Sequence, residues 1–221
     1  MLGGLAVVAI AFAIYSIATG SGGPRSATIG GVNDVQRIFG GIRQDSDRLG
    51  ADDAEIRVTV FNDIQCAPCA EFQIETVDEL VERYARTDAA LFEFRHFSLA
   101  PNDTTVAAIA AEAAGMQERQ WQYLDTFVRN LDAAQANEVD DAFLREVAEA
   151  VPELDPGIWE EDFGSPEAEE AVRADAILAA ELELPAQPAV IVSGPAGERE
   201  LIDTPSLAAI EAAIAAVSAP D

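Results

Sequence analysis

The sequence contains no lysine: all thirteen of its basic residues are arginine, and they stand against forty aspartates and glutamates. The formal charge of -27 leaves few cations that could hold phosphate groups. Nucleic acids and anionic lipid surfaces both attract clustered positive charge, so the composition excludes a nucleic-acid-binding protein. The acidity favours a solvated or salt-adapted surface over a binding face. Because 49% of the residues are hydrophobic, the body of the chain is expected to be globular.

Histidine and cysteine are almost absent, since the chain holds one histidine, His96, and two cysteines, Cys66 and Cys69. A structural zinc site needs about four ligands, usually from two pairs of cysteine or histidine, and this set is too small. Covalent haem would require a histidine directly after the second cysteine, where an alanine stands. We therefore expect no metal and no cofactor. Because His96 shares a strand face with Phe92 and Phe94, we expect a packed or edge-exposed side chain rather than a catalytic one.

The two cysteines lie close together in the stretch FNDIQCAPCAEF, residues 61–72. A structural crosslink gains most by closing a long loop, and this pair closes almost none. The preceding stretch EIRVTVFN alternates like a strand, and a helical pattern follows the cysteines. Cys66 is therefore predicted at a helix N-terminus, where unpaired backbone N–H groups and the helix dipole lower the pKa of a thiol.

This placement predicts that Cys66 is the reactive thiol and that Cys69, one turn into the helix, is a more buried resolving thiol. Asp63 could accept or relay a proton. However, a nearby carboxylate also raises a thiol pKa, and a strand-end turn residue is an equally good interpretation. An inert local disulfide remains the structural alternative for the pair. Trp121 and Tyr123 are most simply aromatic residues of a helix core or edge.

Residues 1–19 form an uncharged stretch whose apolar part runs from Leu2 to about Ala18. This length is at the short end for a transmembrane helix, so the segment is expected to be a retained anchor, slightly favoured, or a signal peptide cleaved after Ala18. The basic leader expected before such a segment is missing, so the start codon could be mis-assigned. Either alternative predicts export, with the cysteines in an oxidising compartment outside the cytoplasm.

The patterns of apolar residues divide the remainder of the chain into segments. Residues 20–50 are rich in glycine, serine and aspartate, and we expect a linker with at most one small helix at VQRIFGGI. Residues 51–101 contain a strand, the cysteine-bearing helix and a second strand, ALFEFRHF. This part is expected to be the first half of the folded core.

Every apolar pattern in residues 102–183 is helical, which predicts a block of helices. Residues 184–218 read as two short strands, PAVIVSG and ERELID, followed by a closing helix. Thr204 can cap that helix, and Pro205 suits its first position. The order of elements predicts an α/β protein with a helical block between its second and third strands.

Three of these segments together resemble the DsbA-like branch of the thioredoxin superfamily, the extracytoplasmic thiol–disulfide oxidoreductases. VTVFNDIQCAPCAEF is similar to that family's strand, active site and helix, and FEFRHFSL to the strand that follows, with Ser98 where proline is common. LPAQPAVIVSG resembles the family's loop with a cis-proline, which maps onto Pro188, preceded by Gln187. The helical residues 102–183 fit the domain that this branch inserts. The likeness runs from near Gly41 to Val217.

The resemblance implies a thioredoxin fold, with a mixed central sheet, flanking helices and an inserted helical domain. It implies an enzyme that exchanges a Cys66–Cys69 disulfide with cysteines of exported proteins, and a membrane redox partner that restores it. It also implies that Pro188 faces the disulfide and leaves the backbone of Gln187 free to pair with an extended substrate peptide. An ordinary trans-proline at a strand start is the alternative.

The residues between the cysteines, Ala67 and Pro68, depart from the pattern of the family's strong oxidants, because no histidine precedes the second cysteine. They are closer to the arrangement of reducing thioredoxins. A DsbA-like oxidase is the first hypothesis. A reductase or isomerase supplied with electrons across the membrane is the second, and a non-catalytic binding or chaperone module that kept the fold is the third.

Overall fold

The structure is a computed structural model that describes residues 29–99, 105–131, 139–196 and 199–218. The apolar segment 1–19, expected to be an anchor or a signal peptide, lies outside the described residues. Within the described ranges, no helix combines the length and the apolar character that a bilayer span requires.

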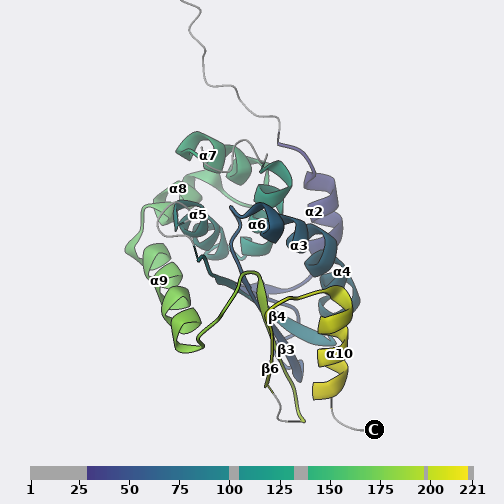
Figure 1. Cartoon of the computed structure of the whole chain (residues 1–221). Coiled ribbons are helices and arrows are strands. Elements are labelled where there is room, and N and C mark those ends of the chain that lie inside the picture. Colours follow the sequence, from purple (N-terminus) through teal and green to yellow (C-terminus); the bar gives the residue numbers. More distant parts are fainter. Residues whose placement is uncertain (1–28, 100–104, 132–138, 197–198, 219–221) are drawn as a thin grey trace, which may run out of the picture.

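A six-stranded mixed sheet forms the centre of the molecule, in the order β1-β2-β4-β3-β5-β6 (Figure 1). The central strands β3 and β4 run parallel, and all other neighbours in this sheet run antiparallel. The expected α/β class with a mixed central sheet is confirmed. The strands are β1 (Gln44–Asp45), β2 (Arg48–Leu49), β3 (Ile56–Asn62), β4 (Ala90–His96), β5 (Ala189–Ser193) and β6 (Arg199–Ile202).

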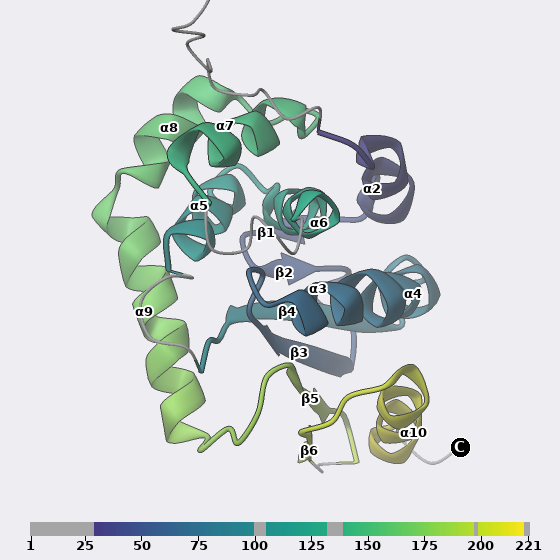
Figure 2. The same ribbon diagram turned by 45° about the horizontal axis from the view of Figure 1, so that its top comes forward.

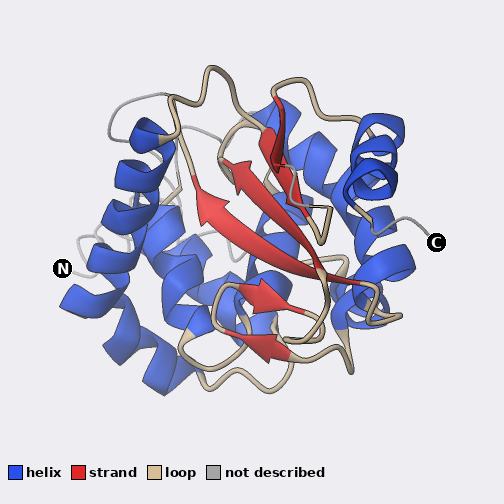
Figure 3. Cartoon of the chain, turned by 90° about the horizontal axis from the view of Figure 1, so that it is seen from below, coloured by secondary structure: helices blue, strands red, loops and turns tan. Residues whose placement is uncertain are grey.

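Helices flank the strands on both sides, as Figure 3 shows. The stretch from residue 67 to residue 85 is one continuous helical rod, in which α-helical and π-helical turns alternate. The helices α5 to α9 lie between β4 and β5 in the chain and occupy the upper and left part of Figure 2, away from α10. The helical elements are α2 (Val32–Phe39), α3 (Ala67–Phe72), η1 (Gln73–Val77), α4 (Asp78–Leu80), η2 (Val81–Ala85), α5 (Thr105–Gly115), α6 (Gln120–Asn130), α7 (Asp141–Ala150), α8 (Pro156–Phe163), α9 (Pro166–Glu181) and α10 (Leu207–Val217).

Burial along β3 explains its alternating sequence. Val58 and Val60 point into the main core and are fully buried. Phe61, on the opposite face, is fully buried too, and packs in a second cluster that includes Ala179 of α9. The long helix α9 therefore covers this second face of the sheet. A parallel strand pair such as β3 and β4 is normally covered on both faces.

Residues 20–50 were expected to form a linker, and the described part of that segment is instead folded into the body. Helix α2 buries Val35, Ile38 and Phe39 in the main core. The Phe39 ring lies 6.1 Å from that of Trp121, centroid to centroid. The short strands β1 and β2 then extend the sheet beyond β4. The apolar spacing predicted the small helix, but strands of two residues are too short to give a periodic signal.

The closing helix begins two residues later than predicted. Ser206, rather than Thr204, is the N-cap of α10, and its hydroxyl oxygen accepts a hydrogen bond from the N–H of Ala209 at 3.3 Å. Pro205 therefore precedes the cap instead of occupying the first helical position. Both serine and threonine are favoured N-cap residues, with serine the better of the two, so the sequence offered two candidates and the helix begins after the stronger one.

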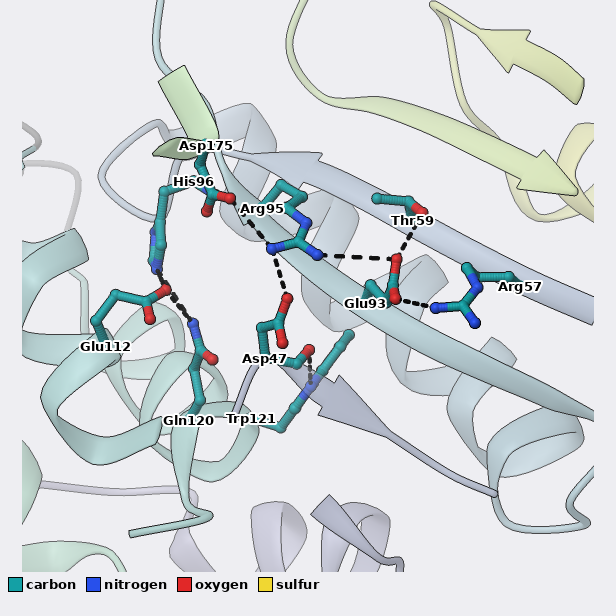
Figure 4. A network of polar contacts seen from close by, with 10 residues as sticks. All are labelled: Asp47, Arg57, Thr59, Glu93, Arg95, His96, Glu112, Gln120, Trp121 and Asp175. Carbon is teal, nitrogen blue, oxygen red and sulfur yellow. Dashed lines mark hydrogen bonds and ion pairs between the residues drawn. The ribbon is translucent and has the colours of Figure 1, made fainter. Parts of the chain in front are cut away.

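A network of partly buried charged side chains joins the sheet to the helices around it, and Figure 4 shows it from close by. Arg95 on β4 lies 2.6 Å from Oδ2 of Asp47 and 3.3 Å from Oδ1 of Asp175 on α9. The Nε1 of Trp121 donates to the carbonyl oxygen of Asp47 at 3.0 Å. Burial raises the pKa of Asp47 to about 6, and the Arg95 guanidinium opposes this shift. One arginine thus ties a hairpin, the sheet and α9 together.

A second buried cluster joins the helical rod to α6. Arg129 forms ion pairs with Asp78 and with Asp125, the latter at 2.6 Å between Nε and Oδ2. Asp125 is fully buried and Asp78 nearly so. Burial, together with the charge of Asp125, raises the pKa of Asp78 to about 9, against the opposing charge of Arg129. One arginine cannot neutralise two buried carboxylates, so one proton is retained by the pair at neutral pH.

Substitution of Asp78 by asparagine is expected to remove a pH dependence of stability. A carboxyl whose pKa is raised on folding contributes fully below the unfolded value near 4, and this contribution is lost progressively as pH rises from there to the folded value of about 9. Asp78→Asn should therefore have little effect at pH 5 and stabilise the protein by roughly 1–3 kcal/mol at pH 8. Urea unfolding at both pH values measures this difference. Glu75→Gln, an exposed change on the same helical rod, serves as control. Equal effects of Asp78→Asn at both pH values would contradict the shared proton.

Candidate active site

Cys66 lies where the chain passes from the sheet into the helical rod. β3 ends at Asn62, a tight turn follows, and Cys66 is the N-cap of α3. Its N–H donates to the carbonyl oxygen of Asp63 at 3.1 Å, and its own carbonyl oxygen accepts from Ala70 N at 2.9 Å. Pro68 occupies the first turn, where no N–H donor is needed. The predicted strand-to-helix junction at the cysteines is confirmed.

The two sulfurs form a disulfide, and their surroundings differ. The Cα atoms of Cys66 and Cys69 are 5.1 Å apart, within the usual range for a disulfide. Cys66 is partly exposed, whereas Cys69 is completely buried. Solvent and substrates therefore reach Cys66 more easily than its partner. Cys66 is also the cysteine beside the unpaired N–H groups of the helix start, which stabilise a thiolate.

The peptide bond between Gln187 and Pro188 is cis. β5 pairs with β3 so that Ala189 lies opposite Phe61. Extending this antiparallel register by one residue places Pro188 beside Asn62, at the end of β3 from which the cysteine turn departs. The structure thus brings the cis-proline loop and the cysteines, about 120 residues apart in sequence, to the same end of the sheet.

The side chain of Gln187 bridges two neighbouring loops. Its Nε2 donates to Oδ2 of Asp63 at 3.3 Å, and its Oε1 accepts from the backbone N–H of Leu99, just after β4. The other oxygen of Asp63 accepts from Gln65 N at 2.9 Å. Both oxygens of this buried carboxylate are therefore engaged by amide donors. Its role as a proton relay stays a prediction, and its observed contacts are those of a residue that holds loops together.

Sequence reasoning considered only the backbone of Gln187 and missed Asn62 altogether. Asn62 is fully buried, and its Nδ2 donates to the carbonyl oxygen of Cys69 at 3.2 Å, which fixes the turn that carries the buried sulfur. A polar residue directly after the apolar pair Val60 and Phe61, at the end of the strand, was the available signal. It was not decisive, because asparagine is also common wherever a strand ends in a turn.

His96 lies at the end of β4 and is buried, as its position beside two phenylalanines predicted. Its ring meets that of Phe94 edge to face at 5.1 Å. Its Nε2 lies 3.2 Å from Oε1 of Glu112, and its backbone N–H donates to Oδ2 of Asp175 at 2.8 Å (Figure 4). These contacts assign His96 to the joint between the sheet and the helices α5 and α9.

A cavity of about 120 Å³ lies between the active-site end of the sheet and the helices α5 and α9. Its walls include Asn62, Asp63 and His96 from the strand ends and Val172 and Ala176 from α9. The helices therefore cover the region behind the cysteine turn. In the part of the chain that the structure describes, no group of three or more histidines, cysteines or carboxylates could hold a metal ion.

Comparison with known proteins agrees with this geometry. A thioredoxin family model matches residues 44–215. The chain is 28% identical over 149 residues to the probable disulfide bond formation protein D of Bacillus anthracis, which covers 66% of this chain and 69% of the relative. The relative from Bacillus cereus gives the same identity and coverage. The chain therefore belongs to the thioredoxin family.

Two solved structures locate the fold more closely within that family. Oxidised BdbD from Bacillus subtilis superposes with a TM-score of 0.66 at 18% identity, over 79% of this chain and 96% of that one. Alpha-DsbA1 from Wolbachia pipientis gives 0.64 at 19% identity, over 77% and 89%. The resemblance seen in the sequence is confirmed: with its Cys66–Cys69 pair, the chain is a DsbA-like protein disulfide oxidoreductase.

Unequal burial predicts unequal reactivity of the two thiols. After reduction, limiting iodoacetamide at pH 7 should alkylate Cys66 at least about tenfold faster than Cys69, because Cys66 is accessible and its thiolate is favoured at the helix start. Peptide mass spectrometry of samples quenched over time measures both rates. The same treatment in denaturant provides the control, in which the two rates should converge. Equal rates in the folded protein would contradict the assignment of Cys66 as the reactive thiol.

Proposed function

We propose that this oxidoreductase works outside the cytoplasm and transfers its Cys66–Cys69 disulfide to cysteines of exported proteins. The observation that carries the proposal is the placement of a partly exposed Cys66 at a helix start, at the end of the sheet that also carries the cis peptide bond of Gln187 and Pro188. A buried, inaccessible disulfide at any other place in the fold would have supported a structural role instead.

The exchange reaction proceeds in two displacements. A substrate thiolate attacks the sulfur of Cys66, the bond between the two enzyme sulfurs breaks, and its electron pair leaves with Cys69. A second substrate thiolate then attacks the substrate sulfur of the mixed disulfide and releases Cys66 as a thiolate. Two substrate thiols become one disulfide, and the enzyme leaves with two thiols, having taken up two electrons and two protons.

Substrate recognition is assigned to the cis-proline loop. An extended peptide can pair with backbone groups at Gln187 by strand addition, which provides affinity without a demand for particular side chains. The contacts of the Gln187 side chain with Asp63 and Leu99 support this, because they hold the loop in place from within the protein. No cofactor takes part, since the disulfide itself carries the oxidising equivalents.

The oxidising direction requires a partner that restores the disulfide. We propose that this partner is a membrane-bound redox protein. The enzyme meets it because segment 1–19 either anchors the enzyme in the membrane or directs its export across the membrane. The names of its curated relatives refer to disulfide bond formation, which agrees with the oxidising direction. The intervening Ala67 and Pro68 favour the alternative, a reductase or isomerase supplied with electrons across the membrane.

Replacing each cysteine separately should give two different results. Cys66→Ser is expected to abolish oxidation of a reduced model protein, because the variant cannot form the disulfide and its remaining sulfur, on Cys69, is buried. Cys69→Ser cannot form the enzyme disulfide, but its Cys66 thiolate can attack a client disulfide and release one client thiolate. The resulting mixed disulfide should accumulate, because Cys69 is not there to displace the client. Non-reducing gels and thiol counting measure both outcomes, and the double variant provides the background. A Cys66→Ser protein with full activity would refute the proposal.

The redox potential decides between the oxidase and its alternative. An oxidase should equilibrate with glutathione near about -120 mV, whereas a thioredoxin-like reductant should lie near about -270 mV. We expect a value at the oxidising end of this range. A reducing value would assign the enzyme to the second class. A protein with no exchange, and with sluggish alkylation of Cys66 at neutral pH, would be a non-catalytic binding or chaperone module.

A further inference from the structure

A buried glutamine follows the cysteine pair along the helical rod. Gln73 is 1% exposed, and neither its Nε2 nor its Oε1 has a hydrogen-bond partner among the described residues. The two buried glutamines of α6 each have a side-chain partner: Gln120 donates to Glu112, and Gln122 accepts from Gln44. A buried amide with no partner lowers the stability of the state in which it occurs, so its retention calls for a physical reason.

Gln73 stands four residues after Cys69 on the same helical rod. Its backbone N–H bonds to the carbonyl oxygens of Cys69 and Ala70, so the helix is continuous between the two residues. Side chains four apart lie on one helix face and lean toward the N-terminus. Both residues are buried. Helix geometry therefore directs the unpaired amide of Gln73 toward the turn that carries Cys69, within the buried interior.

The disulfide form gives this amide only a weak hydrogen-bond acceptor, whereas the dithiol form gives it a stronger acceptor or a donor. A disulfide sulfur carries neither a proton nor a charge, so it is a weak hydrogen-bond acceptor. A thiol can donate its proton to Oε1, and a thiolate accepts strongly from Nε2, because an amide side chain has both a donor and an acceptor. Opening the disulfide thus supplies the kind of partner that Gln73 lacks in the oxidised protein.

We propose that Gln73 stabilises the Cys69 sulfur once the disulfide opens, and so makes the enzyme a stronger oxidant. The inference rests on the exchange reaction proposed above and concerns its first step. When the substrate thiolate attacks Cys66, the electron pair of the broken bond goes to Cys69, and Nε2 of Gln73 donates to the new thiolate. After this thiolate takes up a proton from solvent, the thiol donates to Oε1.

Asn62 contributes to the same arrangement from the other side. Its hydrogen bond to the carbonyl oxygen of Cys69 holds the backbone of that turn against the end of β3. The Cβ from which the sulfur extends therefore keeps its place on the rod when the disulfide opens. The direction of the effect follows: every interaction made only in the dithiol form raises the potential of the couple.

The test is the redox potential of Gln73→Met, a substitution of similar size that removes the amide. Wild type and variant, both as full chains, are equilibrated in glutathione buffers of graded composition, and the dithiol fraction is measured by alkylation and mass spectrometry. The equilibrium constant should shift about tenfold toward the disulfide, equivalent to about 30 mV lower potential. Glu75→Met, an exposed change on the same rod, should shift it by less than about twofold.

Thermal unfolding of the oxidised form shows whether the variant folds, and it should be no less stable than wild type, because an unpaired amide has been removed. If methionine packs poorly, Gln73→Leu provides the second measurement, with the same expected shift. An unchanged or higher potential in a folded variant would overturn the role of Gln73, even with full exchange activity. A wild type that equilibrates with glutathione but never oxidises protein thiols would instead contradict the proposed function.

Discussion

The pairing of β3 with β5 is the constraint on which the active site depends. Its register sets Phe61 opposite Ala189, and two loops distant in sequence consequently leave the sheet side by side. One loop turns into the helix that bears the cysteines, and the other contains the cis peptide bond. A shift of one residue would move every side chain of the strand to the other face and separate the loops. The register of β3 and β5 therefore sets the geometry of the active site.

The helices between β4 and β5 cover the region behind the cysteine turn. Among them, α9 covers the second face of the sheet and is tied to β4 through the contacts of Asp175 with Arg95 and with the backbone of His96. The same burial that makes the core stable leaves Cys69 inaccessible and Cys66 at the edge. Buried polar side chains are normally hydrogen-bonded, and several here find their partners across the boundary between sheet and helices.

Sequence patterns predicted the parts of this fold whose signal is local. Alternation identified β3 and β4, helical periodicity identified the rod after the cysteines, and the spacing of the two cysteines with the strand before them identified the active-site turn. The same patterns missed β1 and β2, because strands of two residues exist only through their pairing with β4. They also placed the cap of α10 at Thr204 rather than Ser206, since both hydroxyls are competent caps.

The sequence by itself determined the class of protein, the reactive pair and its place at a helix start, because those features depend on residues that are neighbours in the chain. Only the tertiary structure decided that Gln187 engages Asp63 and Leu99, and that Gln73 is enclosed without a partner among the described residues. Burial and long-range hydrogen bonds depend on segments that meet only after folding, and no local pattern encodes which segments those will be.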